Sequence, residues 1–411
     1  MFGLAPNGRI FNRFADALLY ILRVSCFNRD LQGVLELLER LIHYLDDFLG
    51  MSVSERLINE ILDRMLELMV LLNIPVKDVK TLRGSPTVKY IGYWWDPRHD
   101  RITLDDVRWS VIEGRLEDFR AALVLFSADA QMLRCLTGLL VGASVVIPTA
   151  KVFNRGFHTV LQRLKATSLP ASEARLIVIS DESMVADVLV DLMWWADLCR
   201  SFRLGGSIPT GIKISEVVHP RVWTKEDCAL VFSCDASNKG LGGYLHEPVM
   251  LDGLPIHHWC FCQLPVGMTM TFTKGRGPEL ERQAFINGRQ VGSGYTEAAA
   301  LLYLLSVFLP RWAALNPIRE PGIGIWCHSD SEVLVSMWRS KKAGVTLLPY
   351  LRALARLSAL YNVTLIVVHI PGSTNTIADA VSRQNWRKFR RLLPSAASLP
   401  TLPLCESQIF F

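Results

Sequence analysis

Residues 230–245 read Leu-Val-Phe-Ser-Cys-Asp-Ala-Ser-Asn-Lys-Gly-Leu-Gly-Gly-Tyr-Leu. An apolar, partly β-branched run gives way at Asp235 to small residues and three glycines, which predicts a strand, a tight turn and a returning strand. The glycines suit a backbone that something else, such as a phosphodiester backbone, approaches closely. The pattern therefore puts a carboxylate at a strand end. Taken alone, such an acid is more often an ordinary turn-forming residue.

Three further acids are expected at the ends of other elements. Glu297 opens a long apolar helix, which we expect Pro310 to stop. Asp330 directly follows the strand-like residues 323–329, and Asp379 comes after another strand-like run and a Pro-Gly turn. Side chains at the ends of separate elements can converge in the fold. Four convergent carboxylates are the ligands that a pair of divalent cations needs in a phosphodiesterase.

The residues around these acids resemble the ribonuclease H domain of retrotransposon polymerases. The matching segments follow the family's order and are Asp235-Ala-Ser, Thr296-Glu297-Ala-Ala-Ala, Ser329-Asp330-Ser, His369-Ile-Pro-Gly372 with Asn375, and Ala378-Asp379-Ala. The resemblance implies a mixed five-stranded sheet with helices on both faces, which agrees with our β-β-β-α-β-α-α-β-α interpretation of the apolar pattern. It also implies that His369 assists product departure and that Asn375 belongs to a nucleic-acid-binding turn.

The same resemblance implies an activity. The implied reaction is hydrolysis of the RNA strand of an RNA:DNA hybrid, with two Mg²⁺ ions, or Mn²⁺, held by Asp235, Glu297, Asp330 and Asp379. One departure from the family is the long spacing between Asp235 and Glu297, so an insertion is expected around residues 265–294. The competing hypothesis is a catalytically inactive remnant of a decayed element that only binds nucleic acid.

A second resemblance concerns the N-terminal part. Residues 41–50 read Leu-Ile-His-Tyr-Leu-Asp-Asp-Phe-Leu-Gly, which predicts two strands joined by a turn that carries Asp46 and Asp47. Adjacent carboxylates at the tip of an apolar hairpin need a cation or open water, and a solvated turn is the simpler explanation. Tyr44-Leu45-Asp46-Asp47 resembles the metal-binding hairpin of reverse transcriptases, which implies RNA-directed DNA polymerase activity.

Neighbouring segments extend this second resemblance. Gly3 lies in a segment similar to the family's template-contacting glycine motif, Lys80 in one similar to a later palm motif, and Gly92 in one similar to the primer-gripping hairpin. The pattern is most similar to DIRS-like retrotransposons, which carry a tyrosine recombinase, with a gypsy-like origin as the alternative. In this family another metal-binding aspartate and the fingers region precede the glycine motif. We therefore expect an incomplete polymerase half that still contacts template-primer nucleic acid.

Two other segments carry chemistry-bearing residues. Lys151 and Arg155 lie in a largely helical region and are expected to contact a duplex backbone, although bases on helices often form only a solvated face. Residues 257–262 read His-His-Trp-Cys-Phe-Cys, for which a half-buried strand is expected and a zinc site is the alternative.

The fold class that we expect is a multidomain α/β and α+β protein. It comprises a partial polymerase palm over residues 1–103, a helical thumb and connection over 104–228, a ribonuclease H-like mixed five-stranded sheet flanked by helices over 229–385, and a basic then disordered tail over 386–411. Of the 411 residues, 50% are hydrophobic and 20% are charged, which is typical of a globular protein. The net charge of +5 permits nucleic-acid binding without requiring it.

The remaining expectations concern location and assembly. Nine cysteines without a Cys-x-x-Cys pair suggest a reducing compartment, so a cytoplasmic or nuclear protein without a signal peptide is expected. The apolar stretches 136–148 and 298–309 are too short to span a membrane and are expected to be buried helices. The sequence does not predict an oligomeric state.

Overall fold

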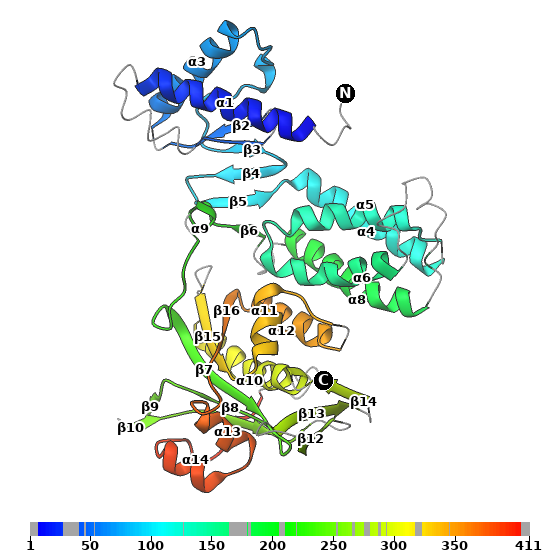
Figure 1. The fold of residues 1–411 in the computed structure, drawn as a ribbon, viewed down its shortest axis with the longest axis vertical. Coiled ribbons are helices and arrows are strands. Elements are labelled where there is room, and N and C mark those ends of the chain that lie inside the picture. The colour runs from blue at the N-terminus through cyan, green and yellow to red at the C-terminus, as the bar shows by residue number, and fades with distance from the viewer. Residues whose placement is uncertain are drawn as a thin grey trace. The chain divides into compact units, whose positions relative to one another are not determined.

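The chain folds into two compact units, one formed by residues 1–110 with 210–220 and the other by residues 111–209 with 221–411 (Figure 1). The structure is a computed structural model. It describes residues 7–27, 41–44, 47–52, 54–125, 127–163, 179, 182–204, 210–218, 220–251, 254–264, 268–274, 280–286, 289–292, 294–316, 323–344 and 346–403.

In its described residues, the first unit contains three α-helices, a short 3-10 helix, a hairpin and a four-stranded antiparallel sheet. Its main elements are α1 (Asn7–Phe27), β1 (Leu41–Tyr44), β2 (Asp47–Gly50), α3 (Glu55–Leu71), η1 (Asp78–Lys80), β3 (Val88–Tyr90), β4 (Tyr93–Asp96), β5 (Arg101–Leu104), β6 (Gly211–Ile212) and α9 (Ile214–Val218). Buried apolar residues of α1 and α3, among them Leu22 and Ile61, form its core. The predicted hairpin at residues 41–50 is present, with Tyr44 paired to Asp47, so Asp47 begins β2 and does not lie in the turn.

The second unit begins with a helical segment. Its helices are α4 (Asp106–Val124, which starts in the first unit), α5 (Ala130–Ala143), η2 (Pro148–Asn154), α6 (Arg155–Arg163) and α8 (Glu182–Arg203). Asp191 is fully buried and links three elements, because it accepts a hydrogen bond from Gly156 N at 2.6 Å and pairs with Arg352 Nη2 at 2.7 Å. Since Arg352 belongs to a helix of the sheet domain, the helical segment and that domain are joined by a buried ion pair.

The sheet domain is a mixed five-stranded sheet flanked by helices. Its five strands lie in the order β11-β8-β7-β15-β16 and are β7 (Cys228–Ala236), β8 (Leu241–Leu245), β11 (Trp259–Cys262), β15 (Ile323–Ser329) and β16 (Val363–His369). Neighbours from β11 to β7 are antiparallel, and β15 is parallel to both β7 and β16. The helices are α10 (Gly294–Leu315), α11 (Glu332–Ser340), α12 (Leu348–Leu360), α13 (Thr376–Ser382) and α14 (Trp386–Leu392). This order of elements confirms the sequence prediction.

Two successive glycines let helices approach both faces of the sheet. A Cβ on Gly242 would lie 2.6 Å from Ser382 N of α13, and one on Gly243 would lie 2.0 Å from Leu304 Cδ1 of α10. Successive strand residues point to opposite faces, so α13 and α10 cover opposite sides of the sheet. The expected close approach at the glycines is confirmed, and the elements that approach Gly242 and Gly243 are helices and not a phosphodiester backbone.

Helix α10 is the central core helix of this domain. Almost every residue from Thr296 to Leu309 is buried, as expected for this apolar stretch. Among the described residues it is the one helix long and apolar enough to cross a membrane, and 72% of its most apolar window is buried inside the protein. The prediction that Pro310 stops the helix is wrong, because α10 continues to Leu315. Arg311 Nη1 donates to Val307 O at 2.8 Å and so satisfies a carbonyl near the proline.

Two segments outside the main sheet form structures of their own. The segment predicted as an insertion forms a separate antiparallel sheet of β12 (Met268–Lys274), β13 (Leu280–Ile286) and β14 (Arg289–Gly292), and β9 (Val249–Leu251) pairs with β10 (Leu254–Ile256). Residues 395–403 differ from the predicted disordered end. Backbone hydrogen bonds hold them against the segment that leads into β11, for example from Ala397 N to His257 O at 2.9 Å.

Candidate metal centre

Three of the four predicted acids converge at one end of the sheet. Asp235 lies near the end of β7, Glu297 in the first turn of α10 and Asp330 directly after β15. One carboxylate oxygen of each lies within 4.8 Å of those of the other two, and the exposed fractions of Asp235 and Glu297 are only 0% and 3%. Hard oxygen donors at this spacing fit Mg²⁺ or Mn²⁺, because a cation offsets the repulsion between buried carboxylates.

Helix α13 supports the centre from the other side of the sheet. Ser382 is fully buried, and its hydroxyl donates to Asp235 Oδ2, while Ser237 Oγ donates to Ser382 O at 2.7 Å. Asn375 is 3% exposed, and its side-chain nitrogen donates to Cys234 O at 2.9 Å. The predicted nucleic-acid-binding asparagine therefore ties α13 to β7 beside Asp235. The sequence analysis did not single out Ser382. Its position three residues after Asp379, in a segment that resembles the ribonuclease H motif, could have indicated it.

The fourth acid, Asp379, is not a member of this group. Its Oδ1 pairs with Arg383 Nε one helical turn further on, and its Oδ2 lies 3.6 Å from Lys388 Nζ. Burial lowers the pKa of Arg383, but the hydrogen bond to Asp379 and the charges of Asp379, Asp235 and Asp330 outweigh burial and raise it. Arg383 therefore interacts electrostatically with three of the four predicted acids.

The end of β16 lies beside Asp330. His369 is exposed and pairs in register with Ser329, which precedes Asp330. Ile370 N donates to Ser329 O at 3.0 Å, and a Cβ on Gly372 would lie 3.1 Å from Asp330 Oδ2. The structure therefore brings the predicted histidine and the Pro-Gly turn next to the acid group.

Two cysteine thiols, those of Cys234 and Cys327, lie close together, and Cys234 directly precedes Asp235. Cys234 Sγ is 3.7 Å from Cys327 Sγ. The hydrogen bond with Cys327, then burial and the nearby charges of Cys327, Glu297 and Asp235, raise the pKa of Cys234 well above its usual range. The Cys234 thiol stays protonated at neutral pH, so it does not offer a thiolate that would compete with the carboxylates for a metal.

The other predicted site residues belong to other elements or lie outside the described residues. Gly3 and Asp46 are outside the described residues, and Tyr44 and Asp47 are paired strand ends. Lys80 is exposed at the end of η1. Gly92 has φ +80° in the turn between β3 and β4. Lys151 is exposed in η2, and Arg155 begins α6.

The His/Cys-rich stretch forms the expected half-buried strand. His257 Nδ1 is 2.8 Å from Ser395 Oγ, and His258 Nδ1 is 3.2 Å from Thr401 Oγ1, so both rings contact the C-terminal segment. Burial raises the pKa of Cys262 to about 11. Within the part of the chain that the structure describes, the carboxylates of Asp235, Glu297 and Asp330 form the one group of three or more side chains suited to a metal.

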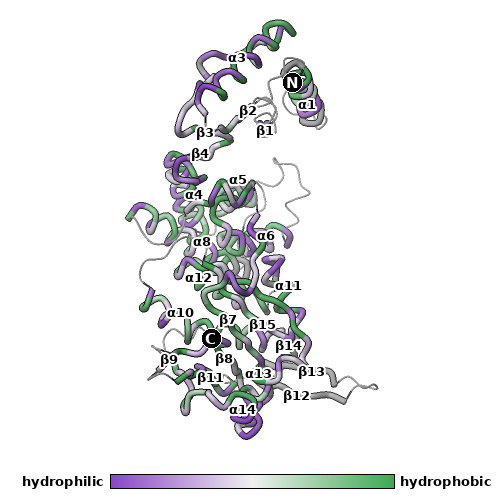
Figure 2. Tube along the Cα trace, turned by 90° about the vertical axis from the view of Figure 1, so that its left-hand side faces the viewer, coloured by the Kyte–Doolittle hydropathy of each residue, from purple (hydrophilic) through white to green (hydrophobic). Residues whose placement is uncertain are grey.

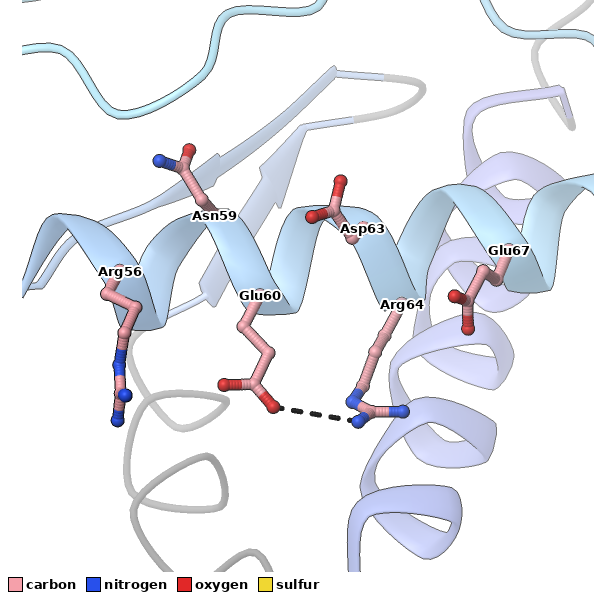
Figure 3. Close-up of a pocket in the computed structure, with 6 residues that line it drawn as sticks. All are labelled: Arg56, Asn59, Glu60, Asp63, Arg64 and Glu67. Carbon is pink, nitrogen blue, oxygen red and sulfur yellow. Dashed lines mark ion pairs between the residues drawn. The ribbon is translucent and has the colours of Figure 1, made fainter.

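A shallow cavity of about 390 Å³ on α3 is a different kind of feature (Figure 3). It is lined by charged and polar side chains of both signs: Arg56, Asn59, Glu60, Asp63, Arg64 and Glu67. Glu60 pairs with Arg64 at 3.5 Å, and Asp63 pairs with Arg83 at 2.5 Å. Gly84 N donates to Asn59 Oδ1 at 2.8 Å. These side chains hold residues 83–84 against the helix.

Comparisons with known proteins found matches among solved structures. No protein-family model and no curated protein sequence matches the chain. Similar solved structures include LC11 ribonuclease H1 in complex with RNA/DNA hybrid, with 16% identity, a TM-score of 0.22 and coverage of 38% of this chain and 94% of that one. Ribonuclease H1 from the archaeon Halobacterium salinarum has 18% identity, a TM-score of 0.23 and coverage of 38% and 97%. The foamy viral protease-reverse transcriptase in complex with dsDNA has 13% identity, a TM-score of 0.28 and coverage of 84% and 58%. At these TM-scores, function has to be inferred from the site residues themselves.

Proposed function

We propose that the second unit is a metal-dependent nuclease that hydrolyses the RNA strand of RNA:DNA hybrids, and that the chain is part of a DIRS-like retrotransposon polymerase. The observation that carries the proposal is the approach of Asp235, Glu297 and Asp330 from three separate elements to within 4.8 Å. A fold has no structural use for three mutually repelling carboxylates at one point, two of them buried, so such a cluster favours a functional role.

Each residue of the acid group and its surroundings has a separate proposed role. Asp235, Glu297 and Asp330 would hold divalent metal, with Asp379 as a further ligand, and the metal would activate water and stabilise the leaving oxygen. Ser382 orients Asp235 by donating to Oδ2. His369, which is exposed at the end of β16 where it pairs with Ser329, would assist departure of the product.

A polymerase role for the first unit has weaker support. The β1–β2 hairpin pairs Tyr44 with Asp47, and His43 Nε2 lies 3.0 Å from Asp16 Oδ1 of α1. We infer only that this unit contacts template-primer nucleic acid.

The test uses the full chain, because a buried ion pair joins the sheet domain to the helical segment. A labelled RNA:DNA hybrid is incubated with Mg²⁺, and cleavage by wild type is compared with Asp235→Asn and with the control Glu332→Gln, an exposed acid near Asp330. Asp235→Asn should reduce cleavage roughly 10³-fold, because a metal ligand contributes several kcal/mol to the transition state. Glu332→Gln should leave the rate unchanged.

The outcomes separate the competing hypotheses. Cleavage of the hybrid but not of a DNA duplex supports the proposal. Hybrid binding without any cleavage by wild type would indicate the inactive remnant. Cleavage at the wild-type rate by Asp235→Asn would remove the acid group from the mechanism.

A further inference from the structure

Helix α14 follows the site-bearing helix α13 and is unusually basic. Its sequence, Trp-Arg-Lys-Phe-Arg-Arg-Leu, contains four cations and no acid. Phe389 is fully buried and packs in a cluster with Tyr244, Trp259 and Val381. Asn385 caps the helix by accepting a hydrogen bond from Lys388 N at 3.1 Å. The helix is therefore fixed by one apolar face, and its charges occupy the other.

The four cations have different tasks. Arg390 has a structural one, because its guanidinium donates to Ala396 O at 2.7 Å and to Ser398 O at 2.8 Å. Arg387 and Arg391 are exposed and one helical turn apart, and neither has an acidic partner among the described residues. Most of α14 is hydrophilic in the hydropathy view (Figure 2). Arg387 and Arg391 thus present positive charge that no described acid neutralises.

The charged face is linked to the acid group through α13. Lys388 Nζ lies 3.6 Å from Asp379 Oδ2, while Ser382 of the same α13 donates to Asp235. Three residues, Arg383 to Asn385, connect α13 to α14. A polyanion that crosses the acid group would therefore meet Lys388 and then the two exposed arginines.

We propose that Arg387, Lys388 and Arg391, here called the α14 basic stripe, bind the sugar-phosphate backbone of the duplex whose scissile phosphate reaches the acid group. The inference rests on the proposed nuclease function and extends it to the substrate-binding surface. Arg387 and Arg391 are one helical turn apart with Lys388 between them in the sequence, and cations gathered on one surface can neutralise phosphate charges. Trp386, with 39% of its surface exposed, adds a flat ring at the start of the stripe.

The geometry favours nucleic acid over an anionic membrane. A helix that lies on a membrane inserts a broad apolar face, whereas α14 has three apolar residues, of which Phe389 is already buried in the protein. The stripe also leads into a group of carboxylates, and the chemistry proposed there acts on a phosphodiester.

The test compares the double variant Arg387→Gln/Arg391→Gln with the matched double variant Arg339→Gln/Arg356→Gln. Arg339 and Arg356 are exposed on α11 and α12, helices that contact α10 on the opposite face of the sheet. Binding of a labelled RNA:DNA hybrid to the full chain is measured by fluorescence anisotropy in Ca²⁺ over a range of salt concentrations. Cleavage in Mg²⁺ is measured in parallel.

For the α14 variant, the slope of log affinity against log salt should become shallower by roughly 1.5–2, since two phosphate contacts release about 0.9 counterion each. Its KM should rise while kcat stays unchanged, because the stripe binds substrate and transition state equally. The control variant should keep the wild-type slope.

The results also distinguish this inference from the nuclease proposal. If the α14 variant has a shallower salt slope of affinity but wild type does not cleave the hybrid, the role of the stripe is supported and the nuclease proposal is refuted. If wild type cleaves the hybrid but wild type, the α14 variant and the control variant share the same salt slope of affinity, the proposed role of the α14 basic stripe is refuted. It is also refuted if wild type does not bind the hybrid. Binding of anionic vesicles that is lost in the α14 variant, with hybrid binding unchanged, would assign the stripe to membranes and overturn the inference.

Discussion

Replacing Glu297 with glutamine should make the metal-free protein more stable. One oxygen of Glu297 lies within 4.8 Å of an oxygen of Asp235 and of one of Asp330. Two unit charges at that separation repel by about 3.5 kcal/mol if the effective dielectric constant is ~20. Arg383 offsets part of the repulsion, because it interacts with Asp235 and Asp330. A neutral amide of the same shape should therefore raise the free energy of unfolding by about 1–3 kcal/mol.

Calorimetric unfolding of the full chain, with and without Mg²⁺, measures this effect. In EDTA, Glu297→Gln should unfold at a higher temperature than wild type. Mg²⁺ should stabilise wild type by about 2.7 kcal/mol at a concentration a hundredfold above its dissociation constant, and should stabilise the variant much less. The order of stability should thus reverse when metal is added.

The control is Glu332→Gln, which removes one exposed carboxylate beside the centre. It should change neither the stability in EDTA nor the gain from Mg²⁺. A Glu297→Gln protein that is less stable than wild type in EDTA, or that gains equally from Mg²⁺, would refute the electrostatic reasoning.

Three other substitutions test separate features. Arg352→Met removes the partner of the fully buried Asp191 and should cost about 3–5 kcal/mol in urea unfolding, so an unchanged midpoint would contradict the role given to this pair. Burial and, second, His328 lower the pKa of His246 to about 4. As the pH falls, His246 is protonated at a higher pH in the unfolded chain than in the folded protein. The free energy of unfolding should therefore fall by roughly 1–2 kcal/mol between about pH 6.5 and about pH 4, after allowance for the partial exposure of the ring. Unfolding at several pH values should show this loss in wild type and not in His246→Gln. Ile91 has φ +52°, which is strained for a β-branched residue, so Ile91→Asn should stabilise the turn by about 1 kcal/mol, and a lower melting temperature would argue against strain.

The sheet and three acids of the centre are predictable from sequence because each rests on a local pattern. Asp235 and Asp330 come at or after apolar runs that form strands, and Glu297 lies in the first turn of an apolar helix. Strand ends of one sheet edge are neighbours in any fold of this class. Convergence therefore follows from topology alone, without knowledge of side-chain positions.

The surroundings of Asp379 are not predictable in the same way. The sequence places it in the matching motif, yet it also places Arg383 four residues later, on the same helical face. Lys388 reaches the same carboxylate from α14, which no local pattern reveals. The metal-binding role of Asp379 stays a prediction.

Two errors have a common physical cause. Pro310 is a helix breaker by local rules, but α10 is buried among tertiary contacts that outweigh one lost hydrogen bond. Residues 395–403 have little periodicity, and their order comes from backbone hydrogen bonds to a distant segment. Composition carries no signal for such pairing.

The position of this C-terminal segment has a consequence for solubility. Strand β11 is the outermost strand of the five-stranded sheet, and Thr401 N donates to Trp259 O at 2.7 Å on its outer side. Trp259 Nε1 also donates to Ala397 O at 2.8 Å. A bare strand edge is a template for pairing with another chain, so removal of the residues after α14 would invite edge-to-edge aggregation while Asp235 and its partners remain intact. If a chain shortened in this way is insoluble, the cause would be the uncovered edge of β11, and the result would not contradict the proposed role of the acid group.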